Sequence, residues 1–98
     1  MERVKTLKPL FSLGEIVATP GALDALVRAN QQPQDFLDRH MVGDWGSELS
    51  EADKAENEYS LRHGFRLLSS YRTAAGEKLW IITEADRSAT TLLLPEEY

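Results

Sequence analysis

The stretch FRLLSSYRTAAGEKLWIITEADRSATTLLLP, residues 65–95, decides the fold class of this 98-residue chain. It holds three β-prone runs, separated by the short polar connections AAGE and EADRSA. Connections of this length join neighbouring antiparallel strands, so the stretch predicts a three-stranded meander. The middle run, KLWIIT, is apolar without alternation, which is typical of a central strand covered on both faces. Trp80 is therefore expected in the core.

The residues ahead of this sheet begin with a short strand and a helix. Residues 10–18, LFSLGEIVA, form a short apolar segment that Gly14 interrupts, and they predict a brief strand. Thr19 and Pro20 then suit the N-cap and the first position of a helix. The apolar stripe of this helix, spaced at i, i+3 and i+4, is predicted to be Leu23, Leu26 and Val27.

Two further helices are predicted before the sheet. One begins at Pro33 and ends near Met41, ahead of Gly43, a residue type that suits the left-handed stop of a helix. The next begins with Ser50 as its cap and runs to about His63. The inner stripe of this last helix is predicted to be Ala52, Ala55 and Tyr59.

These elements predict an α+β fold in which three N-terminal helices pack on a C-terminal antiparallel sheet. The sheet has three strands, or four if the N-terminal segment joins it. The helices cover one face, and the other face needs the N-terminal segment or a second subunit. Residues 1–98 are expected to form a single domain, with residues 1–9 as a flexible basic tail.

The composition excludes several classes of function. The chain has no cysteine, so it has no thiolate metal site, no disulfide framework and no cysteine nucleophile. No apolar run reaches the roughly 18 residues that span a bilayer. The first residues lack the apolar core of a secretory signal. The protein is therefore expected in the cytoplasm, without membrane contact.

The net charge of −5 is concentrated in residues 34–59. That segment holds eight acidic residues against Arg39 and Lys54. Such a surface repels nucleic acid phosphates and attracts basic protein surfaces, so direct nucleic acid binding is not expected. A solvated face that keeps a small protein in solution remains the alternative interpretation.

The turn GDWG, residues 43–46, and the connection TEADRS, residues 83–88, are the candidate contact sites. Trp45 lies between two glycines and is either a core residue or an exposed anchor for a partner. Local turn chemistry is the alternative reading of TEADRS, since Asp86 can bond the backbone two residues on. The candidate protein-interaction residues are Asp44, Trp45, Glu48, Asp53, Glu56, Glu84, Asp86 and Arg87.

Catalytic and metal-binding motifs are sparse. The sequence has no HExxH, GxSxG, GxGxxG or phosphate-binding loop, so no metal and no cofactor are predicted. A small hydrolase or nuclease-like enzyme could only use polar groups that the fold brings together. His40, Asp44 and Asp86 are the candidates for that alternative.

The segments FSLGEIVATPGALDAL, GDWG and GFRLLSSYRTAAGEKLWIITEADRSATTLLLPEEY resemble a family of small bacterial proteins of plasmids and integrated mobile elements. The resemblance runs from about Phe11 to Tyr98. Members carry labels such as "plasmid-related protein" or "type I restriction endonuclease subunit M". An adenine methyltransferase needs a doubly wound cofactor domain and an N/D-P-P-Y/F motif, and this chain has neither. The resemblance implies a mobile-element setting and no catalytic residues.

The resulting hypothesis is a non-enzymatic protein-interaction module of a bacterial mobile element. It would serve as an accessory or inhibitor of a host defence or DNA-processing complex and act through its acidic face. The hydrolase remains the alternative. A homodimer whose sheets or edges pair is a third hypothesis.

Overall fold

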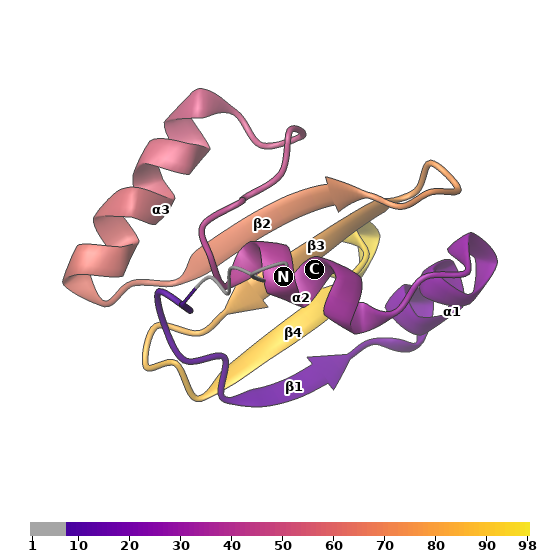
Figure 1. Cartoon of the computed structure of the whole chain (residues 1–98), viewed down its shortest axis with the longest axis horizontal. Coiled ribbons are helices and arrows are strands. Elements are labelled where there is room, and N and C mark those ends of the chain that lie inside the picture. The colour runs from indigo at the N-terminus through magenta and orange to yellow at the C-terminus, as the bar shows by residue number, and fades with distance from the viewer. Residues whose placement is uncertain (1–7) are drawn as a thin grey trace, which may run out of the picture.

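The computed structural model describes residues 8–98, in which three helices and a four-stranded sheet form one body (Figure 1). Residues 1–7, and with them most of the predicted basic tail, lie outside the described residues. The elements in chain order are β1 (Glu15–Ala18), α1 (Pro20–Ala29), α2 (Pro33–His40), α3 (Glu51–His63), β2 (Leu67–Arg72), β3 (Lys78–Thr83), β4 (Ala89–Leu93) and the 3₁₀ helix η1 (Pro95–Glu97).

The sheet is mixed, and the prediction of an antiparallel sheet was wrong in one strand. Its order is β1-β4-β3-β2. The two hairpin pairs, β2 with β3 and β3 with β4, are antiparallel, whereas β1 runs parallel to β4. Short connections impose antiparallel pairing only on the strands that they join. All the helices and two strands separate β1 from β4, so no such connection sets its direction.

One face of the sheet holds the main core, beneath α1 and α2 (Figure 1). The predicted stripe of α1 is only partly confirmed. Leu26 is buried, but Leu23 and Val27 are 48% and 79% exposed, and two alanines take their place against the sheet. The main core cluster consists of Ala22, Leu26, Phe36, Leu37, Tyr71, Leu79, Ile81 and Leu92.

The opposite face of the sheet is covered in part by the C-terminal residues. Trp80, predicted as a core residue, is only half-buried there and packs edge-on against Tyr98, with 5.8 Å between ring centroids. The guanidinium of Arg66 lies over the Tyr98 ring. Part of this cover comes from η1, which brings the end of the chain back beneath β3.

The inner stripe predicted for α3 was also wrong. Ala52, Ala55 and Tyr59 are exposed, and the buried residues of α3 are Asn57 and Ser60. The physical reason is that α3 lies beside the outer edge of β2 and meets backbone polar groups there (Figure 1). A polar inner stripe suits that edge better than an apolar one.

Asn57 fills the edge of β2 as a neighbouring strand would. Its amide nitrogen donates to the Leu68 carbonyl at 2.6 Å, and its amide oxygen accepts from the Leu68 N–H at 3.0 Å. One step along the edge, the Ser70 N–H donates to the Trp45 carbonyl at 3.0 Å. These contacts pair groups that would otherwise be open to another strand.

The helix ends follow the sequence predictions closely. The Thr19 hydroxyl accepts from the Ala22 N–H, and Ser50 accepts in the same way at the start of α3. Gly64 ends α3 in the left-handed region, at φ +73°. The Glu97 carboxylate accepts from the Thr19 hydroxyl at 2.6 Å, which joins the end of the chain to the start of α1. Within residues 8–98, no helix has the length and apolar character needed to cross a bilayer.

Candidate functional site

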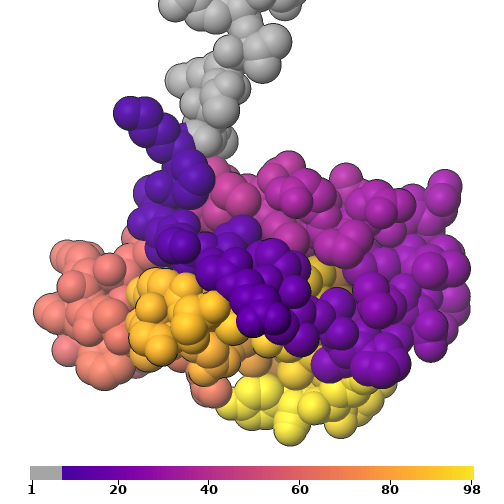
Figure 2. Space-filling model, turned by 90° about the horizontal axis from the view of Figure 1, so that it is seen from below, coloured from indigo at the N-terminus to yellow at the C-terminus, as the bar shows by residue number. Residues whose placement is uncertain are grey.

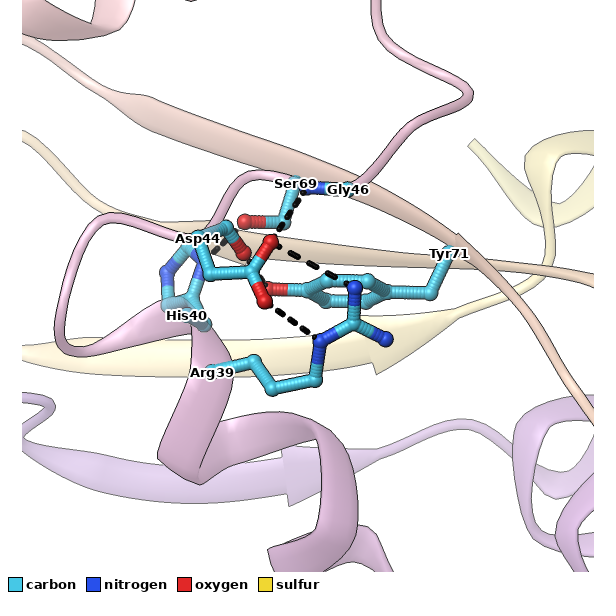
Figure 3. Close-up of polar contacts among 6 residues, drawn as sticks. All are labelled: Arg39, His40, Asp44, Gly46, Ser69 and Tyr71. Carbon is cyan, nitrogen blue, oxygen red and sulfur yellow. Dashed lines mark hydrogen bonds and ion pairs between the residues drawn. The ribbon is translucent and has the colours of Figure 1, made fainter.

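The turn after α2 holds Asp44 in an ion pair beside the sheet (Figure 3). The Arg39 side chain donates to both Asp44 carboxylate oxygens, at 2.7 and 3.4 Å, and lies over the Tyr71 ring at 4.5 Å. These bonds lower the pKa of Asp44 and raise that of Arg39. The same carboxylate accepts from the Gly46 N–H. Asp44 is half-exposed, so it is a bound carboxylate at the surface.

Gly46 brings the turn into contact with β2. A Cβ atom at this position would lie 2.0 Å from the Ser70 carbonyl oxygen, and the residue has φ +94°. The Tyr71 hydroxyl donates to the Asp44 carbonyl from below. Burial raises the pKa of Tyr71, which keeps this hydroxyl protonated as a donor. The GDWG turn therefore joins α2 to the sheet through backbone contacts.

Trp45 is a core residue, which answers the question that the sequence left open. Its side chain is 4% exposed and lies with Leu49 and Leu67 in a second apolar cluster. The ring stacks on Phe11, and its indole N–H donates to the Glu58 carboxylate at 3.0 Å. Almost none of this tryptophan is available to a partner, so the interaction role considered for it has no exposed area to act through.

Beneath the turn, His40 is fully buried within a chain of hydroxyl groups. Its Nδ1 lies 2.5 Å from the Ser69 hydroxyl, and its Nε2 lies 2.9 Å from the Thr83 hydroxyl. Thr83 lies 2.8 Å from Thr90, whose hydroxyl donates to the Leu13 carbonyl. Sequence reasoning missed this network. The signal was available, because the three hydroxyl residues take inward positions on three adjacent strands.

The Leu13 carbonyl can only accept a hydrogen bond, so it determines which group donates in each bond of the network. Thr90 donates to Leu13, so Thr83 donates to Thr90 and accepts from Nε2–H of His40. Nδ1 is then the acceptor for the Ser69 hydroxyl. Burial lowers the pKa of His40 to about 4, with the Arg87 charge contributing, which agrees with a neutral ring.

A serine beside a histidine invites comparison with a nucleophile and its base. Here both side chains are fully buried, and a threonine hydroxyl takes the place of an orienting carboxylate. The three residues of the hydrolase alternative bond elsewhere: His40 to Ser69 and Thr83, Asp44 to Arg39 and Gly46, and Asp86 to Ser88. None of these bonds joins two of the three to one another.

The TEADRS connection has structural roles at two of its three candidate residues. Asp86 accepts from the Ser88 N–H, the turn chemistry considered as the alternative. Hydrogen bonding to the side chain and then to the backbone of Ser88 lowers the pKa of Asp86. Arg87 donates to the carbonyls of Ser60 and Phe65, which ties the turn to the end of α3. Glu84 is exposed.

The acidic segment spans α2, the loop that follows it and α3, and several of its acids are paired. Glu48 accepts from Arg72, and Glu51 pairs with Lys54. Among residues 8–98, Asp53 and Glu56 form no ion pair, and both are exposed on α3. These two acids are the sequence candidates that stay accessible beside the outward face of α3.

We define the α3 surface by its exposed residues, Ala52, Asp53, Ala55, Glu56, Tyr59, His63 and Phe65. Tyr59 and Phe65 are 52% and 53% exposed. Their rings are stacked, 7° from parallel with centroids 5.9 Å apart, and His63 stacks on Tyr59 at 4.1 Å. The aromatic stack continues the line of the two alanines along one side of the helix.

The part of the chain that the structure describes holds no group of three or more histidine, aspartate or glutamate side chains placed to bind a metal ion. Comparison with protein-family models, curated proteins and solved structures finds no match to this chain. Function is therefore inferred from the contacts, burial and charge of the described residues.

Proposed function

We propose that the protein is a non-enzymatic interaction module that binds a partner protein through the α3 surface. The observation that carries this proposal is the orientation of α3. Its periodic apolar residues, Ala52, Ala55 and Tyr59, lie outward, while a polar side holds the helix against β2.

The chemistry of the α3 surface fits a protein partner. Small alanine side chains allow a second helix or strand to approach closely, and stacked aromatic rings offer contact area with little conformational freedom to lose. Asp53 and Glu56 flank this line and favour a partner with basic residues around an apolar centre. About half of the surface of Tyr59 and of Phe65 is exposed, which leaves aromatic contact area open to a partner.

The setting of this function is part of the proposal. The resemblance to small proteins of plasmids and integrated elements supports a mobile-element origin and a site of action in the host cytoplasm. The partner would then belong to a host defence or DNA-processing complex. The protein would act on that complex as an accessory or an inhibitor.

Substitutions on the α3 surface test the proposal by comparative capture from bacterial lysate. Ala55→Arg places a long charged side chain in the centre of the surface, and Tyr59→Ala removes the ring at its end. We expect each to reduce the recovered partner at least tenfold, or about 1.4 kcal/mol. Asp53→Lys combined with Glu56→Lys tests whether the negative charge of these two residues contributes to binding. Asp44 and Glu48 are left unchanged, because they pair with Arg39 and Arg72.

Two substitutions elsewhere serve as matched controls. Ala75→Arg lies in the exposed β2–β3 turn, and Asp24→Lys lies on the exposed side of α1. Glu84 in the β3–β4 turn is set aside as a control because it lies near Phe65. Both controls should leave the recovered partner unchanged. Thermal unfolding of every variant establishes that the fold is retained. Recovery of the same proteins at the same level by wild type, Ala55→Arg and Tyr59→Ala contradicts the proposal.

A further inference from the structure

The two edges of the sheet are treated differently by the chain. The β2 edge is covered by Asn57 and by the Trp45 carbonyl. The β1 edge faces outward, and Figure 2 looks onto it, with no other described segment lying over the indigo strand. Ile16 and Val17 on β1 are 45% and 42% exposed. β1 is four residues long and carries one charged side chain, Glu15, but it has no lysine, proline or bulge to protect its edge.

The backbone of β1 presents a short row of unused hydrogen-bonding groups. The N–H groups of Glu15 and Thr19 donate to Ser88 and Leu92 beside β4. Pairing alternates along a parallel strand, so Val17 also bonds toward β4. The amide and carbonyl groups of Ile16 and Ala18 consequently point away from the sheet, where only another strand or water can bond them.

We propose that β1 pairs antiparallel with β1 of a second copy of this chain, about a two-fold axis through Val17. In this register Ile16 of each copy lies opposite Ala18 of the other, and the pair exchanges two hydrogen bonds on each side of the axis. All four outward groups of each strand are then satisfied. The two sheets join into one continuous sheet.

The neighbouring registers are less complete. Moving the axis to Ile16 pairs Ala18 with Gly14, which has φ +65° and is not extended. Moving the axis to Ala18 pairs Ile16 with Pro20, which has no N–H to donate. Only the register centred on Val17 uses extended residues with both backbone groups available.

The side chains agree with the same register. The two Val17 side chains meet on the axis, in a non-hydrogen-bonded position where cross-strand side chains are closest. Glu15 lies opposite Thr19 of the other copy, so the two carboxylates do not face each other. The register is self-complementary, a property that a strand from an unrelated protein would not share. A second copy of this chain is therefore the partner that we propose for β1.

This pairing goes beyond the proposed function and leaves the α3 surface free. The order of the sheet places β1 and β2 at opposite edges, and α3 lies beside β2. The paired form would carry one α3 surface at each end of the extended sheet. A partner with two binding sites would then be held by both copies at once.

Sedimentation equilibrium of the full chain, from micromolar to millimolar concentration, tests the pairing. The wild type is expected to approach twice the mass of one chain. Val17→Lys places two ammonium groups together on the axis, and Val17→Glu places two carboxylates there, so each variant alone stays at the mass of one chain. An equimolar mixture of the two is expected to return to twice that mass. Val27→Lys, on the exposed side of α1, behaves as the wild type.

Three sedimentation results overturn the proposal: a wild type that stays at the mass of one chain, a Val17→Lys variant that pairs as the wild type does, or a mixture that does not associate. Hydrogen exchange provides a measurement that requires no variant. The Ile16 and Ala18 amides should slow as concentration rises, while the Val17 amide, already bonded to β4, stays unchanged. Exchange at Ile16 and Ala18 that ignores concentration also overturns the proposal. If the β1 edge instead binds a strand of another protein, exchange at Ile16 and Ala18 does not depend on the concentration of this chain.

Discussion

At the scale of single residues, the buried hydroxyl chain around His40 places polar groups where the core is otherwise apolar. In the described chain no buried side-chain nitrogen or oxygen is left without a partner. The hydrogen-bond network around His40 joins α2 to β2, β3 and β4 and ends on the Leu13 carbonyl ahead of β1. Because every donor has one acceptor, the network favours a single position of α2 on the sheet.

The neutral state of His40 predicts a specific loss of stability in mild acid. Its pKa in the folded protein is about 4, below the ordinary value of 6.5. Between these values the unfolded chain binds the proton and the folded chain does not, so the free energy of unfolding falls as pH is lowered. We expect a loss of about 2 kcal/mol between pH 7 and pH 5, measured by urea unfolding.

His40→Gln supplies the comparison for this pH dependence. Glutamine keeps a donor and an acceptor but does not titrate, so its unfolding free energy should change little between pH 7 and pH 5. The carboxylates with lowered pKa values, including Asp44, lose their contribution at more acidic pH. An equal slope for wild type and His40→Gln in this interval refutes a buried neutral His40.

Gly46 and Gly76 allow the close approach to β2 to be measured separately from backbone strain. Both have similar positive φ angles, +94° and +89°. A Cβ at Gly46 meets the Ser70 carbonyl, whereas a Cβ at Gly76 meets nothing within 4 Å. Gly76→Ala should destabilise by roughly 1 kcal/mol, from φ alone. Gly46→Ala should destabilise by more than twice as much, and equal effects would contradict the close contact.

At the scale of elements, the sequence predicted where helices and strands begin and end better than which sides they turn inward. Thr19, Pro20, Ser50 and Gly64 act on their own neighbours, so local residue types determine their roles. The orientation of α3 depends on a strand edge that lies elsewhere in the chain. The rule that the apolar residues of a helix face inward fails for α3, because the unpaired backbone groups of a strand edge are satisfied by an amide such as that of Asn57.

Removing the Asn57 amide should expose the β2 edge. Asn57→Ala loses both bonds to Leu68, and we expect about 2 kcal/mol of destabilisation in urea unfolding. Increased light scattering at high concentration should accompany it, because an open edge pairs with other chains. Glu56→Ala, one residue away and exposed, should stay within about 0.5 kcal/mol of wild type. Equal stability of the two variants would show that the edge contact contributes little.

At the scale of the whole molecule, the α+β class followed from the meander of residues 65–95, but the direction of β1 did not. Hairpin strands are specified by their short turns. A strand that returns from the far end of the chain is placed by tertiary contacts, which one sequence does not reveal. The candidate site residues also fall into two groups, those held by tertiary contacts and those that stay exposed. Trp45 and Arg87 are held by distant residues, whereas Asp53 and Glu56 stay exposed beside a surface that only the fold reveals.

Site-specific photo-crosslinking in a bacterial host tests whether the α3 surface binds a partner protein. A photoreactive amino acid replaces Ala55 on α3 in one variant and Ala75 in the β2–β3 turn in another. Both alanines are exposed, so the two positions differ in surroundings and not in access to solvent. We expect a discrete covalent adduct with another protein from position 55 and none from position 75. No adduct at 55, or the same adducts at both, would contradict this expectation.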